Sequence, residues 1–555
     1  MRRAGELAAV YGTALVSAGL AIYWPALSGG FVFDDVQLTA PGVLHGMLDP
    51  RVAVRAPRPL LMLSYGLNYW WAGMSPFGFH LVNILIHCCN AVLLWRILAV
   101  LAARSVVPGW GIVVYGTPIL FLSSPVLTET VAYVSSRSEL LATAFYLLAL
   151  LVFVSRWRER RDWLAAAVIV VLYVCAVSSK QSAVTLPGAL VLVEWLLLSR
   201  RIRWALVGGM VVGGVVVGAS LLKAPTAGFF LENVPWTDYL STQLRVWFLY
   251  LRLLILPVGL NVDHDVAASH NLTDHQAWLA LLGLAVLVRA ALWARQRVPL
   301  VSFGVLFFVV TLAPSSSFFP LADFAAEHRL YLPSIGFYVA ITGGLAAVWR
   351  WSSYVVPWVA IAAVCSAYAA GTWQRSRVWA DGLALWEDAA RKSPLKYRPH
   401  NHVGVELLRR HRYEEAAEAF AGAEALVGLG SPHHAHIVNN LGLSHANRGL
   451  HAKAVEYYER ALRIADLPTF RANLAISQVR MGAEAEGWLN FERALQMSGG
   501  AVSVRMARAD EYMRVGRLEE AVAEYELILS VYPDFESARQ QLAVAGLKAR
   551  DCGQD

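Results

Sequence analysis

Charged residues are scarce in this sequence of 555 residues. Asp, Glu, Lys and Arg make up only 16% of the chain, whereas ordinary soluble domains carry about 25%. Hydrophobic residues reach 57%, and the mean hydropathy is +0.48. This composition excludes a chain built only of soluble domains.

The scarcity of charge is confined to the first two thirds of the chain. Residues 1–372 hold 24 basic and 16 acidic side chains, whereas the remaining residues hold 23 basic and 24 acidic ones. We therefore expect a membrane-embedded body followed by a soluble, nearly neutral domain. The net charge of +7 belongs to the membrane part, where it sets topology. The tail has no basic patch interleaved with aromatic residues, which argues against nucleic-acid binding.

Cysteine and lysine are also rare. The five cysteines form neither a CxxC pair nor a metal-ligand spacing, so we expect small buried side chains rather than a redox or metal site. Six lysines accompany 41 arginines, which is typical of a GC-rich bacterial genome. The first apolar run lacks a small-residue cleavage site, so Met1, Arg2 and Arg3 are interpreted as the inside flank of a retained membrane span.

The apolar stretches predict about eleven membrane spans, since a spanning helix needs about 20 mostly apolar residues. They lie at 7–27, 79–101, 107–124, 140–155, 163–178, 182–199, 204–222, 276–294, 298–313, 333–349 and 354–372. The short stretch 241–257 carries Arg245 and Arg252 on one helical face, so we expect it to lie in the interface or to re-enter the membrane. The positive-inside rule then places the N-terminus inside and the tail outside. Loops 28–78, 123–139 and 314–332 also face outward in this topology.

The tail repeats itself. Gly449, Gly482 and Gly516 are 33 and 34 residues apart, and His411 holds the matching place 38 residues before Gly449. A helix–turn–helix period of this length is the tetratricopeptide signature. We predict about four repeats over 399–545, after a transmembrane domain at 1–372 and a linker helix region at 373–398, with a tail at 546–555.

The repeats suit a concave surface that binds a peptide or a protein partner, although a purely structural stack is the alternative. His433, His434 and His436 resemble a metal-binding tract, but we expect them to lie in a solvated turn between repeats. The segment 60–74 is apolar and aromatic but too short to span a membrane, so it predicts an interfacial helix.

Chemistry is first indicated by Asp34 and Asp35, which follow the first span directly. Two carboxylates at a membrane surface are costly unless they have a function. Neighbours on an extended segment point to opposite faces, which is unsuitable for a retaining mechanism that needs two convergent carboxylates. One of them acting as a base while the other orients it or binds a metal fits better, and an exposed acidic loop start is the alternative.

Polar residues gather on the other outward segments. His80, Asn83, His87 and Asn90 follow one helical stripe, on which His80 is near enough to reach the Asp34 loop and Asn90 suits hydrogen bonding between helices. The loop after the third span carries Glu129, Arg137 and Glu139. If residues 327–329 are extended, Glu327 and Arg329 face one way, and an outward arginine is a good phosphate ligand. Lys180, Arg245 and Arg252 extend this basic lining. The group Asp263, His264 and Asp265 suits a metal but lacks a further ligand, so we expect a solvated loop.

The order of several segments resembles a known family. They are FVFDDVQL, FHLVNILIHCCNAVLL, SPVLTETVAYVSSRSELLATAF, SKQSAVTLPGALVLVE, LYLRLLILPVGLNVDHD and LADFAAEHRLYLPSIGF, with the repeats after WEDAARKSP. This order resembles the membrane glycosyltransferases of the C superfamily, above all the transmembrane and tetratricopeptide repeat containing O-mannosyltransferases and their bacterial relatives. Two features depart from the family pattern. Ser124 and Leu127 stand where the family has histidines, and Gln181 stands where it has a glutamate after the lysine.

The resemblance implies an all-α fold, with a polytopic helix bundle followed by a repeat solenoid. It also implies inverting transfer of a sugar, mannose first, from a polyprenyl-phosphate donor to a hydroxyl of a protein acceptor on the outer face. Asp34 or Asp35 would take the proton of the acceptor. Arg329, with Arg252, Arg245 and Lys180 behind it, would stabilise the leaving phosphate. Glu129, Glu327 and His80 would position acceptor or sugar. No metal ligand is assigned, and a divalent metal is left open.

The alternatives are transfer to a lipid or polysaccharide acceptor and a non-catalytic membrane scaffold that assembles partners through its repeats. A transporter would need charges in the middle of its spans or matching helix breaks in two halves, and the predicted spans show few of either. We expect a multi-pass protein of a bacterial inner membrane, with a cytoplasmic N-terminus and periplasmic repeats.

Overall fold

The chain is helical in a computed structural model. The structure describes residues 2–39, 43–47, 49, 51–52, 56, 58–104, 110–156, 163–198, 204–221, 234–317, 319–348, 355–533 and 535–552, and helices are the regular elements within these ranges. Two compact units make up the chain. Unit 1 comprises Met1–Thr39 and Leu44–Gly382, and unit 2 centres on Leu383–Asp555. The predicted all-α class is confirmed.

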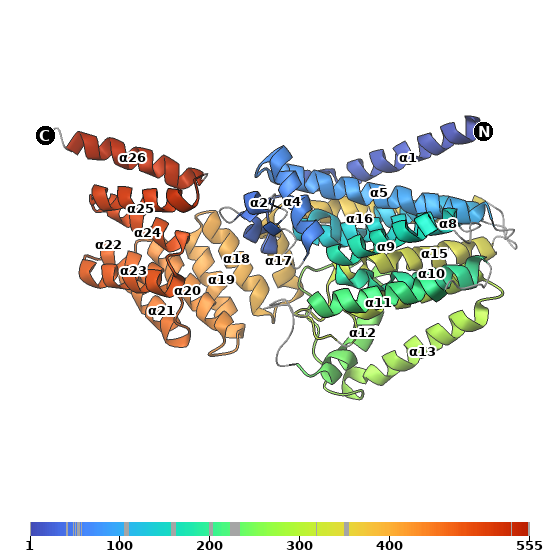
Figure 1. Cartoon of the computed structure of the whole chain (residues 1–555). Coiled ribbons are helices and arrows are strands. Elements are labelled where there is room, and N and C mark those ends of the chain that lie inside the picture. The colour runs from blue at the N-terminus through green and yellow to red at the C-terminus, as the bar shows by residue number, and fades with distance from the viewer. Residues whose placement is uncertain are drawn as a thin grey trace. The chain divides into compact units, whose positions relative to one another are not determined.

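Unit 1 contains long helices that lie side by side with roughly parallel axes, while α13 is tilted away from the others (Figure 1). Its α-helices are α1 (Arg2–Ile22), α2 (Val43–Gly46), α4 (Pro59–Ala72), α5 (Pro76–Ala102), α6 (Trp110–Ser123), α7 (Thr128–Ala132), α8 (Arg137–Ser155), α9 (Trp163–Ser179), α10 (Leu186–Leu192), α11 (Trp204–Leu221), α12 (Trp236–Ile255), α13 (Ala277–Ala294), α14 (Pro299–Leu312), α15 (Tyr331–Val348) and α16 (Val355–Trp379). The short helical segments are η1 (Trp24–Ser28), η2 (Phe33–Thr39), η3 (Pro125–Leu127), η4 (Val134–Ser136), η5 (Gln181–Thr185), η6 (Val193–Leu198), η7 (Asp274–Gln276), η8 (Ala313–Ser315) and η9 (Glu327–Leu330).

The prediction of about eleven spans is wrong by length and composition. Six helices in the described part are long and apolar enough to cross a membrane, or seven if the bent pair Trp110–Ser123 and Pro125–Ala132 is counted as one span. The six are Pro76–Ala102, Val134–Ser155, Gln181–Leu198, Asp274–Ala294, Glu327–Val348 and Val355–Trp379. Three other predicted spans form shorter apolar helices, at Ala8–Ile22, Trp163–Ser179 and Pro299–Ser315. An apolar run in the sequence does not reveal where its helix ends, which explains the overcount.

The helices of unit 1 pack closely where small residues meet. A Cβ atom on Gly336 of α15 would lie 2.5 Å from the carbonyl oxygen of Gly304 on α14, and the reverse substitution would place a Cβ 2.4 Å from the carbonyl oxygen of Gly336. Backbone contact of this kind is how helices associate when both partners are apolar. Glycine at these two positions therefore sets the distance between α14 and α15.

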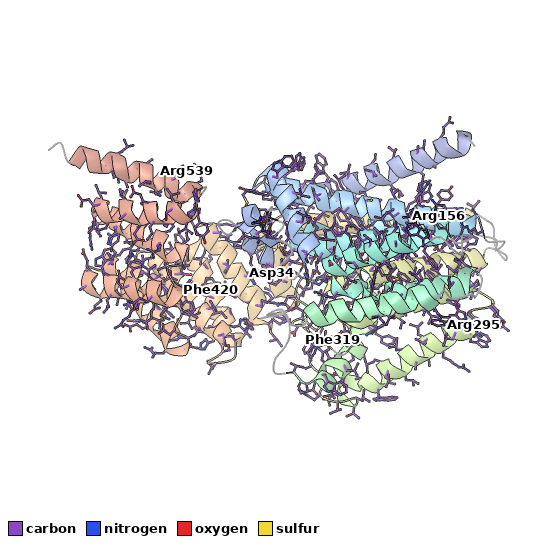
Figure 2. The ribbon with its side chains drawn as sticks, in the orientation of Figure 1. Asp34, Arg156, Arg295, Phe319, Phe420 and Arg539 are labelled. Carbon is purple, nitrogen blue, oxygen red and sulfur yellow. The ribbon has the colours of Figure 1, made fainter. Side chains whose placement is uncertain are left out.

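The two ends of unit 1 differ in composition. Asp34 and Phe319 lie at one end of the helices, and Arg156 and Arg295 lie at the opposite end, where Figure 1 also shows the N-terminus (Figure 2). This is the arrangement that the predicted sidedness requires. The amphipathic helix α12, which contains residues 241–255 of the stretch 241–257, is not among the candidate spans in the described part of the chain.

Unit 2 is a stack of helix pairs. Its helices are α17 (Gly382–Lys392), α18 (Tyr397–Arg409), α19 (Tyr413–Leu426), α20 (Pro432–Asn447), α21 (His451–Ile464), α22 (Pro468–Arg480), α23 (Glu484–Ser498), α24 (Val502–Arg514), α25 (Leu518–Val531) and α26 (Glu536–Cys552). The equivalent turn residues adopt left-handed backbone, with φ of 59°, 78°, 87° and 82° at His411, Gly449, Gly482 and Gly516. The repeat period read from the sequence therefore marks true turns.

The three clustered histidines of unit 2 were predicted to lie in a solvated turn, and this prediction is wrong. They occupy the first turns of α20, where Ser431 caps the helix by accepting a hydrogen bond from the His434 N–H at 3.1 Å. His434 is buried, and the rings of His433 and His436 contact Tyr397 and Phe470. The Ser-Pro pair that begins this helix is a standard N-terminal signal, and it was the feature that the sequence analysis missed.

Candidate catalytic site in unit 1

The loop with the paired aspartates turns sharply before them. Phe33 has φ of 53°, a left-handed conformation that costs a bulky residue about 1–2 kcal/mol. Its ring lies 6.0 Å from the ring of Tyr133, centroid to centroid. After this turn, η2 exposes Asp34 and buries Asp35 completely. The two neighbouring carboxylates therefore occupy opposite environments, although η2 is helical and not the extended segment that the prediction of opposite faces assumed.

Asp35 joins its loop to the start of α8. Its carboxylate accepts hydrogen bonds from the Ser135 N–H at 2.7 Å, the Ser135 hydroxyl at 2.5 Å, and the Val134 N–H at 3.3 Å. The Val32 N–H donates a further bond at 3.5 Å. Burial nevertheless raises the pKa of Asp35 to about 7, and these hydrogen bonds limit the rise. The carboxylate of Asp35 is thus occupied by hydrogen bonds to protein groups.

The backbone of Asp34 contacts one of two stacked aromatic side chains. Its backbone N–H donates to the Tyr133 hydroxyl at 3.3 Å, and Tyr133 stacks on Trp379 of α16 with ring centroids 5.8 Å apart. Tyr133 and Ser135 lie inside the quoted segment SPVLTETVAYVSSRSELLATAF, but they carry no charge and no role was predicted for them or for Trp379. The exposed Asp34 carboxylate is held in place by its backbone and can accept a proton from a bound hydroxyl.

Glu129 and Glu327 hold three loops together. Glu129 Oε1 accepts from His328 Nδ1 at 2.5 Å, and its Oε2 accepts from the Glu327 N–H at 3.2 Å. Glu327 Oε1 accepts from the Asn261 N–H at 2.5 Å and lies 3.0 Å from His264 Nε2. Both carboxylates are buried. The contacts of the predicted sugar-positioning glutamates are therefore with protein groups.

Two predictions about these loops are wrong. Glu327 and Arg329 do not share a face, because η9 is helical rather than extended and turns the two side chains apart. The segment at Asp263 and His264 is not a solvated loop, since both side chains are largely buried and His264 binds Glu327.

No three metal-ligating side chains come together in the described part of the chain.

Arg329 braces its own loop. It is 8% exposed, and its guanidinium donates to the carbonyl of Asp323 at 2.7 Å and more weakly to Phe324, Ser315 and the Tyr239 hydroxyl at 3.3–3.4 Å. Tyr250 supports the same loop by bonding both the N–H and the C=O of Ala326. The lateral helix α12, which carries Tyr239 and Tyr250, therefore positions the loop with the arginine.

A second cation lies near Arg329. Lys180 Nζ is 3.0 Å from Glu139 Oε1, on the first turn of α8. Burial lowers the pKa of Lys180, Glu139 opposes this shift, and the positive charges of Arg58 and Arg329 add to it. Arg58 and Arg329 thus each lie within electrostatic range of Lys180. The sequence analysis did not single out Arg58, which precedes the interfacial helix α4.

Arg245 and Arg252 bind a different loop. Arg245 donates to the Ala267 carbonyl at 2.9 Å and to the Ser269 hydroxyl at 3.0 Å, and Arg252 donates to the Val258 carbonyl at 3.1 Å. Among the described residues, no contact joins either of them to Arg329. The predicted basic lining is therefore not a single cluster.

Two further polar residues lie beneath the aspartate loop. His80 is 1% exposed and packs under it, since a Cβ on Gly29 would lie 3.1 Å from His80 Nε2. The buried guanidinium of Arg137 donates to the side-chain oxygens of Asn83 and Asn68 at 2.7 and 2.8 Å. These bonds fix α4, α5 and α8 around the loop.

The structure also places Asn90, from the predicted helical stripe, and the two residues that stand where the family has histidines. Asn90 bonds the Leu140 carbonyl and the Tyr331 hydroxyl, which is the predicted bonding between helices. Ser124 accepts a hydrogen bond from the Tyr338 hydroxyl at 2.6 Å, and Leu127 is fully buried. The two residues that replace family histidines are thus packed into the core.

Known proteins resemble both parts of the chain. The tetratricopeptide repeat family matches residues 435–466 and 502–535. The human protein O-mannosyl-transferase TMTC3 is 23% identical over 95% of this chain and 61% of its own length. The Caenorhabditis elegans protein O-mannosyl-transferase F38B6.6 is 24% identical over 71% of this chain and 59% of its own length. A solved tetratricopeptide repeat protein of Thermus thermophilus is 19% identical, covering 33% of this chain and 94% of its own, with a TM-score of 0.27.

The chain spans about three fifths of the length of these curated relatives. The relatives come from human, mouse, nematode and fly, so the predicted bacterial inner membrane is not borne out.

Proposed function

The chain resembles the protein O-mannosyl-transferases with transmembrane and tetratricopeptide repeat regions, and on this premise we propose that it transfers a sugar from a polyprenyl-phosphate donor to a hydroxyl of a polypeptide. Mannose is the first candidate for the sugar. The reaction takes place on the outer face of the membrane, at the end of unit 1 that carries Asp34. The observation that carries the proposal is an exposed carboxylate at Asp34, fixed by a buried partner at Asp35.

Asp34 is the base in this proposal. It takes the proton of the acceptor hydroxyl, whose oxygen forms a bond to the anomeric carbon of the sugar. The bond from that carbon to the phosphate oxygen breaks on the opposite side, so the configuration inverts. The lipid phosphate leaves with the bonding electron pair, as an anion that is stable near neutral pH and needs no general acid.

Lys180, Arg58 and Arg329 supply positive charge for the leaving phosphate. Lys180 is better placed than Arg329 for direct contact, since its side chain is 19% exposed, whereas Arg329 donates mainly to backbone carbonyls. Glu139 lies 3.0 Å from Lys180 and holds the ammonium in position. Asp35 acts indirectly, by fixing the loop that presents Asp34.

Unit 2 provides the surface that binds a polypeptide, in line with the use that repeat solenoids make of their concave faces. The protein is embedded in the membrane through unit 1, with the N-terminus on the cytoplasmic side and unit 2 on the outer side. A divalent metal is not required for any step derived above.

The test is turnover of labelled polyprenyl-phosphate sugars by the purified full chain in detergent. We expect Asp34→Asn to reduce turnover about 10²- to 10⁴-fold, the usual contribution of a positioned base. Asp49→Asn is the matched control, because Asp49 is an exposed carboxylate of the same loop region. Equal turnover by wild type and Asp34→Asn would remove Asp34 from the mechanism. Absence of turnover with every donor would favour the scaffold alternative.

A further inference from the structure

His328 is the accessible member of the segment at residues 327–329. Its side chain is 23% exposed, whereas Glu327 and Arg329 are 1% and 8% exposed. It lies between two residues that the sequence analysis selected, but nothing in the proposed mechanism uses it. A partly exposed imidazole flanked by buried charged groups can meet a ligand that its neighbours cannot reach.

Glu129 fixes the orientation of this imidazole. Its carboxylate is 4% exposed and accepts the Nδ1 proton of His328 at 2.5 Å, while its second oxygen holds the Glu327 N–H at 3.2 Å. A carboxylate bound to one ring nitrogen sets both the tautomer and the direction of the other nitrogen. Nε2 of His328 is thereby directed away from Glu129.

The imidazole lies among the groups proposed to bind the donor phosphate. Lys180, Glu139, Arg329 and Asp323 are the charged groups that act on it. They come from the end of α9, the first turn of α8, η9 itself and the loop before η9. The element that contacts the ring directly is α7, which supplies Glu129 and packs against η9.

On the basis of the proposed transfer reaction, we propose that His328 Nε2 accepts a hydrogen bond from a hydroxyl of the donor's sugar, with Glu129 as the positioning residue of the imidazole. Lys180 and Arg329 are fixed by their own protein contacts. His328 thus adds a polar contact beside them that is both oriented and accessible. The step is a binding contact, so no bond forms or breaks at the imidazole.

Substitution of His328 by asparagine or by glutamine tests its two ring nitrogens one at a time. Asparagine places a polar group near the position of Nδ1 and retains the contact with Glu129, whereas glutamine reaches the position of Nε2. We expect His328→Asn to raise the dissociation constant for a labelled polyprenyl-phosphate mannose about tenfold, the size of a lost hydrogen bond. His328→Gln should raise it less than threefold.

His270→Gln is the matched control, since His270 Nδ1 bonds Asp238 at 2.7 Å in the same way but its side chain is 73% exposed. Binding by this variant should equal that of wild type. If His328→Asn also binds like wild type, or if His328→Gln is the weaker of the two, His328 serves only to hold the loop. If the wild type binds no such donor, the proposed function fails together with this contact. The unmutated protein therefore distinguishes the two failures.

Discussion

At the scale of the residue, the paired aspartates are the most informative feature. Asp34 is exposed and Asp35 is fully buried, although they are neighbours in one helical segment, η2. Four hydrogen bonds reach the Asp35 carboxylate, three of them from Val134 and Ser135. In the proposed function, Asp34 is therefore the base and Asp35 maintains the loop.

The raised pKa of Asp35 predicts a pH-dependent stability. Between about pH 4, where an unfolded aspartate titrates, and about pH 7, the folded protein retains a proton that the unfolded chain has lost. The folded state binds more protons in this window, so the stability should fall as the pH rises through it. Asp35→Asn should flatten this dependence.

Thermal unfolding of the detergent-solubilised protein between pH 4 and pH 8 measures the effect. Asp49→Asn provides the control, because the exposed carboxylate at residue 49 contributes little to such a slope. A pH slope that is the same in wild type and Asp35→Asn would show that Asp35 titrates normally in the folded protein.

At the scale of the element, glycine contacts determine the packing of α14 on α15. A methyl group on Gly336 would meet the carbonyl of Gly304 at 2.5 Å and the N–H nitrogen of Phe308 at 2.7 Å. Backbone atoms cannot move aside as a flexible side chain does, so Gly336→Ala should cost about 1–3 kcal/mol. Unfolding in detergent measures this cost.

Gly344→Ala is the matched control on the same helix. The nearest atom to a Cβ there is the Val301 Cγ2 at 3.9 Å, an ordinary contact distance. This variant should be as stable as wild type or up to about 1 kcal/mol more stable, because alanine favours a helix interior over glycine. Similar losses in both variants would mean that the α14–α15 contact is not the cause.

The turns of unit 2 allow a test in which two similar substitutions change stability in opposite directions. Gly482 has φ of 87°, so Gly482→Ala should destabilise unit 2 by about 1–2 kcal/mol. Gly422 is exposed in α19 with open space around it, so Gly422→Ala should stabilise it by about 0.5–1 kcal/mol. Unfolding followed by helical circular dichroism would show the two changes, and a shift of the same sign in both would contradict the turn assignment.

These elements show what the sequence can and cannot predict. The repeat period was predictable, because the spacing of turn residues is a local property. The burial of Asp35 beside an exposed Asp34 was not, since the prediction of opposite faces assumed an extended segment and η2 is helical. The contacts of Asp34 and Asp35 with Tyr133 and Ser135 were not predictable either, since these uncharged partners lie about 100 residues from the aspartates. The common face of Glu327 and Arg329 was predicted wrongly because it depended on an extended backbone that η9 does not have.

At the scale of the whole molecule, the two units differ in structure and in proposed role. Unit 1 holds the candidate site among helices that are long and apolar enough to cross a membrane, and unit 2 holds the repeats. In the proposed function, the first unit binds a lipid-linked sugar and the second a polypeptide. Chemistry at Asp34 joins the two substrates.

The number of spans shows the limit of composition at this scale. About eleven apolar stretches are present in the sequence, but only six helices in the described ranges meet the length and hydropathy of a span, or seven with the bent pair. The bend of 51° between Trp110–Ser123 and Pro125–Ala132 is also the feature that brings Glu129 to His328. A kink that shortens a span thus contributes to the candidate site.

The most direct test of the central claim is the configuration of the product. The full-length protein is incubated with a labelled polyprenyl-phosphate mannose and an acceptor polypeptide, and the anomeric configuration of the labelled polypeptide is determined by NMR. The account predicts a sugar linked to a hydroxyl with a configuration opposite to that of the donor, and no such product with Asp34→Asn. A labelled polypeptide with retained configuration, or one that forms equally well with Asp34→Asn, would contradict it.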